Sequence, residues 1–302
     1  MEVLSFPCSV STPTAIALGR FDGVHTGHKK VISAAASAQG LTPAVFTFCD
    51  NPGKSEHKLL STEEEKLELI EACGIKILVN STFEAVRGMS AQEFFTNVLV
   101  EKLNAKALFC GYNYRFGKGA SADVNTLKSL CDSHGIALVC TEEISADFTA
   151  VSSTAIRNLL SCGEVEKANT LLGRNYSLSG RIVHGNAIGR TIETPTLNID
   201  VDKSKLLPLF GVYATKAFVG DRVFDSVTNI GIKPTIGSDS PTIETYLLDF
   251  IGDFYGDDCT IELVGFIRPE VKFTDLSTLK EQITKDIEKA KQILKYRCKK
   301  TS

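Results

Sequence analysis

The sequence predicts two domains in succession, an α/β domain built on a parallel sheet and then a small antiparallel β-barrel with one C-terminal helix. Residues 15–160 alternate short apolar runs with helical patterns, which is typical of parallel strands joined by crossover helices. From about residue 175 the pattern changes to strands separated by turns. The chain has 302 residues, more than the roughly 250 at which a single core usually stops growing. We therefore predict domains at 1–175 and 176–302.

Local signals support individual elements. Thr62 and Glu65 have the spacing of a capping box at a helix start, and Gly74 stands where that helix should end. The Gly-Asp pair at 220–221 predicts a hairpin turn between two strands. Residues 275–298 carry apolar side chains at helical spacing, which predicts an amphipathic helix lying on the barrel.

The composition excludes several classes of protein. An apolar fraction of 43% and a charged fraction of 23% are typical of a soluble globular protein, and no apolar run is long enough to span a membrane. A net charge of -3 with scattered signs predicts no nucleic-acid partner. The N-terminus lacks a basic segment before its apolar residues, so we expect no signal peptide and a cytoplasmic location. Nine cysteines without a CxxC pair indicate reduced core thiols rather than disulfides or zinc ligands.

Residues 19–28, GRFDGVHTGH, carry the strongest functional signal, because they join the first strand of the alternating region to a helix. Glycines let the backbone approach phosphate oxygens, and the helix start adds positive partial charge. The imidazoles of His25 and His28 can donate hydrogen bonds to an α-phosphate that gains charge during in-line displacement. The alternative is that both histidines are incidental polar residues, but the HxGH spacing in this setting favours the functional interpretation.

Two further segments have the character of ligand loops. Residues 111–117, GYNYRFG, follow an apolar strand at the edge where open α/β sheets bind ligands, although a plain structural turn would look the same. Residues 151–157, VSSTAIR, offer hydroxyls and amides at a helix start, together with the guanidinium of Arg157. These groups suit an anionic ligand, and an ordinary Ser/Thr cap could use the same atoms.

These three segments resemble the HxGH nucleotidyltransferases, and nearly the whole chain resembles the prokaryotic bifunctional riboflavin kinase/FAD synthetase family. The resemblance implies a Rossmann-like N-terminal domain that adenylylates FMN with ATP and Mg²⁺, giving FAD and pyrophosphate. It implies catalytic roles for His25, His28 and Arg157. It also assigns ATP or flavin binding to Gly19, Phe21, Asp22, Gly27, Asn51, Gly111, Asn113, Phe116, Ser152, Ser153 and Thr154. Asn51 stands where the family usually has a histidine, and an amide cannot carry a proton.

The C-terminal half resembles the flavokinase barrel, which makes FMN from riboflavin and ATP. The resemblance implies that Thr196 and Asn198 bind Mg²⁺, for which hydroxyl and amide oxygens are suitable ligands. It implies that Glu244 is the base for the riboflavin hydroxyl. From spacing alone, these would be a strand start after a proline and an outward-facing strand glutamate. The residues assigned to ATP or flavin binding in this half are Gly185, Gly189, Arg190, Pro195, Thr196, Asn198 and Arg268.

The flavokinase motif departs from the family pattern at two positions. Glu193 replaces a glycine and Thr194 replaces an aromatic or apolar residue, and a carboxylate beside bound phosphates would repel them. We expect kinase activity to be present but weak. A monofunctional FAD synthetase with a flavin-binding barrel is the alternative. A cytidylyl- or nicotinamide-mononucleotide adenylyltransferase is disfavoured by the flavokinase-like half, and a non-catalytic flavin sensor by the pyrophosphate-binding segment.

Overall fold

The computed structural model describes residues 1–50, 58–146, 149–183, 196–232, 241–250, 252, 254–271, 273 and 275–298. The chain forms two compact units, Met1–Ser153 and Thr154–Ser302. Helices α6 (Ser153–Ser161) and α7 (Val165–Leu172) lie between this division and the predicted boundary at residue 175. The boundary at residue 175 stays a prediction.

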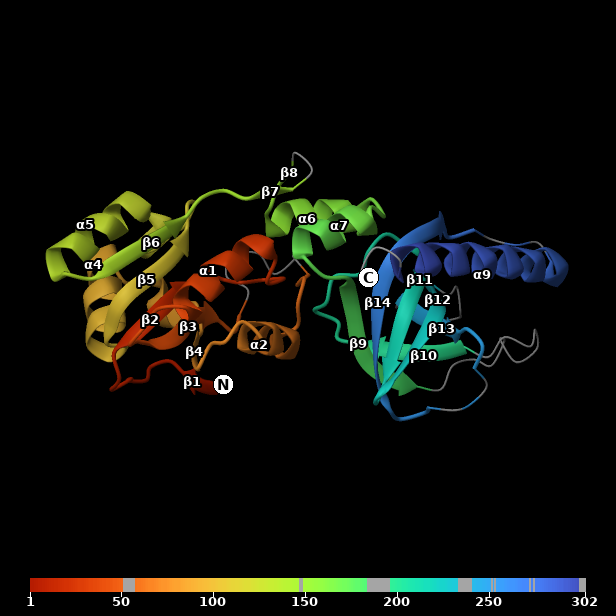
Figure 1. The fold of residues 1–302 in the computed structure, drawn as a ribbon, viewed down its shortest axis with the longest axis horizontal. Coiled ribbons are helices and arrows are strands. Elements are labelled where there is room, and N and C mark those ends of the chain that lie inside the picture. The colour runs from red at the N-terminus through yellow and green to blue at the C-terminus, as the bar shows by residue number, and fades with distance from the viewer. Residues whose placement is uncertain are drawn as a thin grey trace. The chain divides into compact units, whose positions relative to one another are not determined.

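The first unit is built on a six-stranded sheet in the order β1-β4-β3-β2-β5-β6, and every neighbouring pair is parallel. This confirms the predicted parallel α/β fold (Figure 1). The strands are β1 (Glu2–Ser5), β2 (Thr14–Leu18), β3 (Thr42–Phe48), β4 (Ile77–Ser81), β5 (Ala105–Gly111) and β6 (Ala137–Thr141). A two-stranded ribbon of β7 (Ser145–Ala146) and β8 (Thr149–Ala150) follows the sheet in the chain.

Helices cover both faces of this sheet, which explains why its central strands β2 and β3 are buried without alternation. Ala15 and Ala17 of β2 share a core cluster with Ile32 of α1, while Ile16 of the same strand shares the other cluster with Phe95. The helical segments are α1 (Thr26–Ala36), α2 (Glu63–Glu71), α3 (Glu84–Arg87), α4 (Ala91–Glu93), the π-helical η1 (Phe94–Lys102), the 3₁₀ turn η2 (Lys118–Ala120) and α5 (Val124–His134).

The predicted helix signals are confirmed at α2. The Thr62 hydroxyl accepts a hydrogen bond from the Glu65 amide at 3.2 Å, and the Glu65 carboxylate accepts one from the Thr62 amide at 3.0 Å. Gly74 lies just beyond the end of α2 with φ +89°, a conformation that favours glycine.

The second unit contains a closed antiparallel barrel of six strands in the order β10-β13-β12-β11-β14-β9, as predicted. They are β9 (Tyr176–Val183), β10 (Thr196–Val201), β11 (Gly211–Val219), β12 (Arg222–Ile232), β13 (Pro241–Leu247) and β14 (Asp258–Pro269). The predicted hairpin is confirmed, because Val219 pairs with Arg222 across a turn in which Gly220 has φ +54°.

The predicted C-terminal helix is α9 (Leu276–Cys298), which runs along the outside of the barrel strands (Figure 1). Ala290 and Leu294 of α9 pack in one apolar cluster with Val212 and Ala214 of β11. Among the helices of the described residues, none combines the length and apolar character that a membrane crossing requires.

The cysteines whose surroundings the structure describes are free thiols, but not all of them are in the core. Eight have described surroundings: Cys110, Cys131 and Cys259 are buried, Cys8 and Cys73 are partly buried, and Cys49, Cys140 and Cys162 are exposed. The prediction of core thiols is therefore wrong for the last three. Cys49 directly follows β3 and Cys162 directly follows α6, and at such element ends apolar neighbours in the sequence do not imply burial.

Candidate active sites

The strand order places the N-terminal candidate site at a topological switch point. Strand β2 pairs with β3 along one of its edges and with β5 along the other, so the strand order reverses its direction at β2. The loops that follow β2 and β5 therefore leave the same edge of the sheet on either side of this point. Open α/β sheets bind ligands in this crevice.

The loop after β2, residues 19–28, has a constrained backbone. Phe21, Gly23 and Val24 all have positive φ, at 53°, 83° and 36°. The Phe21 ring folds back so closely that a Cβ on Gly19 would lie 2.8 Å from it. Non-glycine residues at positive φ cost free energy, so the surrounding packing must hold this conformation, as is common at binding sites.

His25 is the N-cap of α1. Its Nδ1 accepts a hydrogen bond from the His28 amide at 3.2 Å. The two imidazole rings stack with centroids 3.5 Å apart and planes 17° apart, and the Phe21 ring meets His28 edge-on at 5.3 Å. The helix start and the histidine pair predicted as a phosphate site are thus one rigid unit.

His28 carries the chemically distinctive atom of this unit. Its Nδ1 is buried and has no hydrogen-bond partner among the residues that the structure describes. Burial, and secondly the neighbouring His25 ring, lower the pKa of His28 well below its ordinary value of 6.5. The imidazole is therefore neutral at neutral pH. A buried ring nitrogen without a partner is costly, which favours its use by a ligand.

Asp22 binds the chain's own backbone. Its carboxylate accepts hydrogen bonds from the amides of Leu60 at 2.9 Å and Ser61 at 3.3 Å, and its carbonyl accepts one from the Ser153 hydroxyl at 2.9 Å. The residue thus fastens two other segments to the loop after β2. Ligand binding by Asp22 and Ser153 stays a prediction.

The loop after β5 has a mixed character. The Asn113 side chain folds back over Gly111, where an added Cβ would lie 3.4 Å from its Oδ1. Phe116 is buried, stacks on Tyr114 at 5.7 Å and belongs to the core cluster of the sheet. For Phe116 the structure therefore supports the alternative of a structural turn residue, whereas Asn113 lies at the carboxyl end of β5.

The segment 151–157 straddles the two units. Ser152 and Ser153 belong to the first unit, and Ser153 begins α6 and contacts Asp22. Thr154 and Arg157 belong to the second. Their roles at the N-terminal site stay predictions.

In the barrel, strand register brings two predicted kinase residues together. Asn198 of β10 is directly opposite Glu244 of β13, and Glu244 is also opposite Asn229 of β12. Thr196 lies two residues before Asn198 and therefore on the same face. Opposite side chains in antiparallel pairs lie about 4.5–5.5 Å apart at Cβ, so Asn198, Glu244 and Asn229 form one polar row across three strands. Asn229 is a member of this row that the sequence analysis missed.

The polar row lies on the outer face of the barrel. The alternate residues Leu197, Ile199, Ile243 and Thr245 are buried, whereas Asn198 and Glu244 are partly exposed. Hydroxyl, amide and carboxylate oxygens fit a hard cation such as Mg²⁺. Within the described ranges, no cluster of three or more His, Cys, Asp or Glu side chains could hold a metal ion.

The remaining assigned residues separate into two groups. Arg268 donates to both carboxylate oxygens of Asp286 on α9, with distances of 2.8–3.1 Å. This ion pair is a structural role that the sequence analysis did not foresee, and ligand binding by Arg268 stays a prediction. The positions outside the described residues are Asn51, Gly185, Gly189, Arg190, Glu193, Thr194 and Pro195.

Comparison with known proteins identifies both halves. Residues 9–155 match the family described as FAD synthetase, and residues 172–294 match the family described as riboflavin kinase. A bifunctional riboflavin kinase/FMN adenylyltransferase of Bacillus subtilis is 37% identical over 290 residues, covering 92% of this chain and 91% of the relative. Its namesake in Escherichia coli K12 is 32% identical over 282 residues and covers 90% of each chain.

A solved structure from Streptococcus pneumoniae, described as a macrolide-efflux protein, matches with a TM-score of 0.88 and 26% identity. The match covers 96% of this chain and 99% of that one, and it carries the fold alone. Similarity over 90–92% of the sequence, together with the two family matches, leads to one conclusion: the chain belongs to the family of bifunctional riboflavin kinase/FMN adenylyltransferases.

Proposed function

We propose that this chain makes FAD from riboflavin in two ATP-dependent steps, with phosphorylation in the barrel and adenylylation in the α/β unit. The observation that carries the proposal is the tandem match to both families, over residues 9–155 and 172–294. The monofunctional alternative is not favoured, because the riboflavin kinase match spans the barrel. Riboflavin, FMN and ATP are the proposed substrates, and the cytoplasmic location expected from the sequence stays a prediction.

In the adenylylation step, a phosphate oxygen of FMN attacks the α-phosphorus of ATP. The bond to the bridging oxygen of the β-phosphate breaks, and pyrophosphate leaves. The neutral imidazole of His28 would donate a hydrogen bond to a non-bridging α-phosphate oxygen as its charge grows. The backbone amides at the start of α1 would stabilise the same charge. Because the attacking phosphate is already ionised, positioning matters more than proton transfer.

In the phosphorylation step, the terminal hydroxyl of riboflavin attacks the γ-phosphorus of ATP and ADP leaves. Glu244 would accept the hydroxyl proton. Thr196 and Asn198 would hold Mg²⁺, which neutralises phosphate charge when bound. The register that places Asn198 opposite Glu244 supports this division of roles, since the proposed metal ligand then lies beside the proposed base.

The direct test is incubation of the purified chain with ATP, Mg²⁺ and either riboflavin or FMN, followed by chromatographic identification of the flavins. We expect FMN and FAD from riboflavin, and FAD from FMN. FAD from FMN with no product from riboflavin would select the monofunctional alternative. No FAD from either substrate would refute the proposal.

A further inference from the structure

Lys66 is a buried cation near the loop after β2, and the proposed chemistry does not use it. Its side chain is only 8% exposed although it lies on α2, where a lysine usually faces solvent. Its Nζ donates a hydrogen bond to the Phe48 carbonyl at 2.7 Å and pairs with Glu63 Oε2 at 2.8 Å. A buried ammonium is costly unless it is paired and hydrogen-bonded, so these two contacts account for its placement.

The contacts of Lys66 continue to a second strand. Glu63 Oε1 accepts a hydrogen bond from Nδ2 of the Asn80 side chain at 2.6 Å. Phe48 is the last residue of β3, and Asn80 is the penultimate residue of the neighbouring strand β4. Lys66 and Glu63 therefore tie the first turns of α2 to the carboxyl ends of two adjacent strands. We refer to Lys66, Glu63 and Asn80 as the α2 bracket.

The α2 bracket borders the loop after β2. Asp22 of that loop holds the amides of Leu60 and Ser61, which lead into α2. The Ser61 hydroxyl is buried and has no hydrogen-bond partner within the described part of the chain. A small pocket lies between these elements, and its lining includes Arg20, Asp22, Phe48, Ser61, Glu63 and Lys66. Glu63 and Lys66 of the bracket thus line the same pocket as the loop after β2.

We propose that Lys66 is a positioning residue for adenylyl transfer. By holding the Phe48 carbonyl, it fixes the end of β3 against α2 and so sets the shape of the pocket beside the loop after β2. It touches no reacting atom in this proposal, and it acts through Phe48 and Glu63. The inference rests on the proposed adenylylation in the first unit. A displacement of about 1 Å at such a site can lower the rate about 100-fold.

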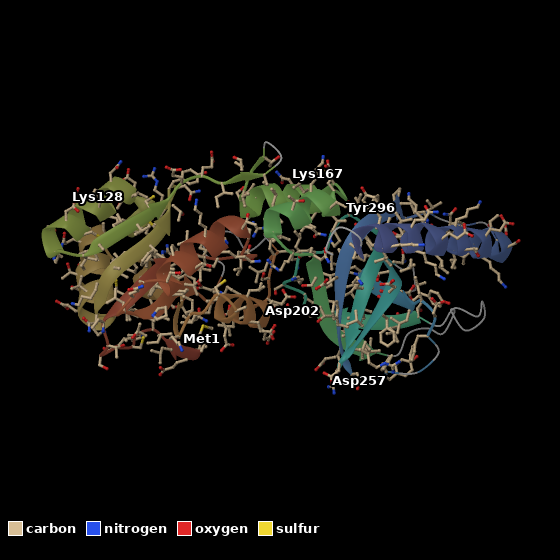
Figure 2. All side chains as sticks on the ribbon, viewed as in Figure 1. Met1, Lys128, Lys167, Asp202, Asp257 and Tyr296 are labelled. Carbon is tan, nitrogen blue, oxygen red and sulfur yellow. The ribbon has the colours of Figure 1, made fainter. Side chains whose placement is uncertain are left out.

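The test uses the full-length chain with Lys66→Met, which keeps the unbranched shape and most of the length of the side chain and removes its charge, and Lys66→Arg, which keeps the charge. Lys128→Met is the matched control, because Lys128 lies on α5 with its side chain 65% exposed and pairs with Asp132 at the surface (Figure 2). For each variant, kcat and KM for FMN adenylylation are measured. Riboflavin phosphorylation by the same preparation, which reports on the other unit, is the internal control.

We expect Lys66→Met to lower kcat/KM for FMN adenylylation at least about tenfold, with part of the loss in kcat. Lys66→Arg should recover part of it. Lys128→Met should stay within about twofold of the parent, as should riboflavin phosphorylation in every variant.

Adenylylation by Lys66→Met within twofold of the parent would overturn the inference, as would a loss that disappears when each variant is assayed well below its own melting temperature. Should Lys66→Met not fold, Glu63→Gln removes the charge pair with little change in shape; it should lower adenylylation, and unchanged activity there would equally overturn the inference. A parent chain that forms no FAD from FMN would refute the proposed function instead.

Discussion

The two histidines of the loop after β2 have unequal roles. Nδ1 of His25 accepts the capping hydrogen bond at the start of α1, whereas the buried Nδ1 of His28 has no hydrogen-bond partner among the described residues. The sequence predicts both residues at a strand-to-helix junction. It cannot predict which of them is the cap of α1. That depends on the backbone conformation of the loop, in which the Phe21 ring packs closely against Gly19.

Removal of the His28 imidazole should abolish most adenylyl transfer. We expect His28→Ala to lower kcat for FAD formation about 100- to 1,000-fold, because one preorganised donor to the growing phosphate charge is lost. Flavin binding should persist, and riboflavin phosphorylation should be unchanged. His134→Ala, at the exposed end of α5, is the matched control. Equal FAD formation by His28→Ala and the parent would contradict the assignment.

The same burial predicts a pH dependence of stability. The pKa of folded His28 lies below 6.5, so as the pH falls the unfolded chain takes up the proton first. The free energy of unfolding should therefore fall with decreasing pH below about 6.5, by at most about 1.4 kcal/mol per pH unit from this group. His28→Gln should lose less melting temperature than the parent between pH 7.5 and 5.5. An equal or larger loss in the variant would count against a buried neutral imidazole.

At the scale of elements, the sequence predicts helices, caps and hairpins from short-range signals, but it does not predict which distant strands pair. The capping box at Thr62, the hairpin at Gly220 and helix α9 all depend on neighbours within a few residues, and all are confirmed. The edge strand β1 was not predicted as part of the sheet, because it pairs with β4, more than 70 residues later. For the same reason the sequence identifies Asn198 and Glu244 without showing that they are opposite each other.

The β10–β13 pair predicts a selective loss of one activity. Glu244→Gln should lower riboflavin phosphorylation about 100- to 10,000-fold, because an amide cannot accept the hydroxyl proton. Adenylylation of supplied FMN should be unaffected. Asp200→Asn is the control, since Asp200 is an exposed residue two positions beyond Asn198 on the same strand. Normal phosphorylation by Glu244→Gln would exclude this residue as the base.

The Arg268–Asp286 pair joins α9 to the barrel. Asp286 is 3% exposed, so Asp286→Ala should lower the free energy of unfolding of this unit by about 3 kcal/mol through the unpaired guanidinium left behind. Lys291→Ala, which removes a 3.6 Å surface pair with Asp249, should cost well under about 1 kcal/mol. Denaturant unfolding followed by circular dichroism measures both. Equal costs would show that the buried pair does not anchor α9.

At the scale of the whole molecule, the chain joins two units whose proposed reactions follow one another, since the product of the barrel is the substrate of the α/β unit. The change from alternating helices and strands to turns and strands is enough to predict both folds. The sequence departures at Asn51, Glu193 and Thr194 lie outside the described residues, so their effects remain questions of activity. The roles of the site residues stay predictions from resemblance. Hydrogen bonding adds that Asp22 binds the backbone of Leu60, and register adds that Asn198 is opposite Glu244, and the sequence alone shows neither.

Phosphate labelling tests the two-step account most directly. The purified chain is incubated with riboflavin, Mg²⁺ and ATP labelled at either the α- or the γ-phosphorus, and the flavins are separated. We predict that γ-label enters FMN and FAD, while α-label enters FAD alone. Flavins that carry no α-label, with FMN accumulating, would contradict adenylyl transfer by this chain, and FAD formed from riboflavin without γ-label would contradict phosphorylation by the barrel.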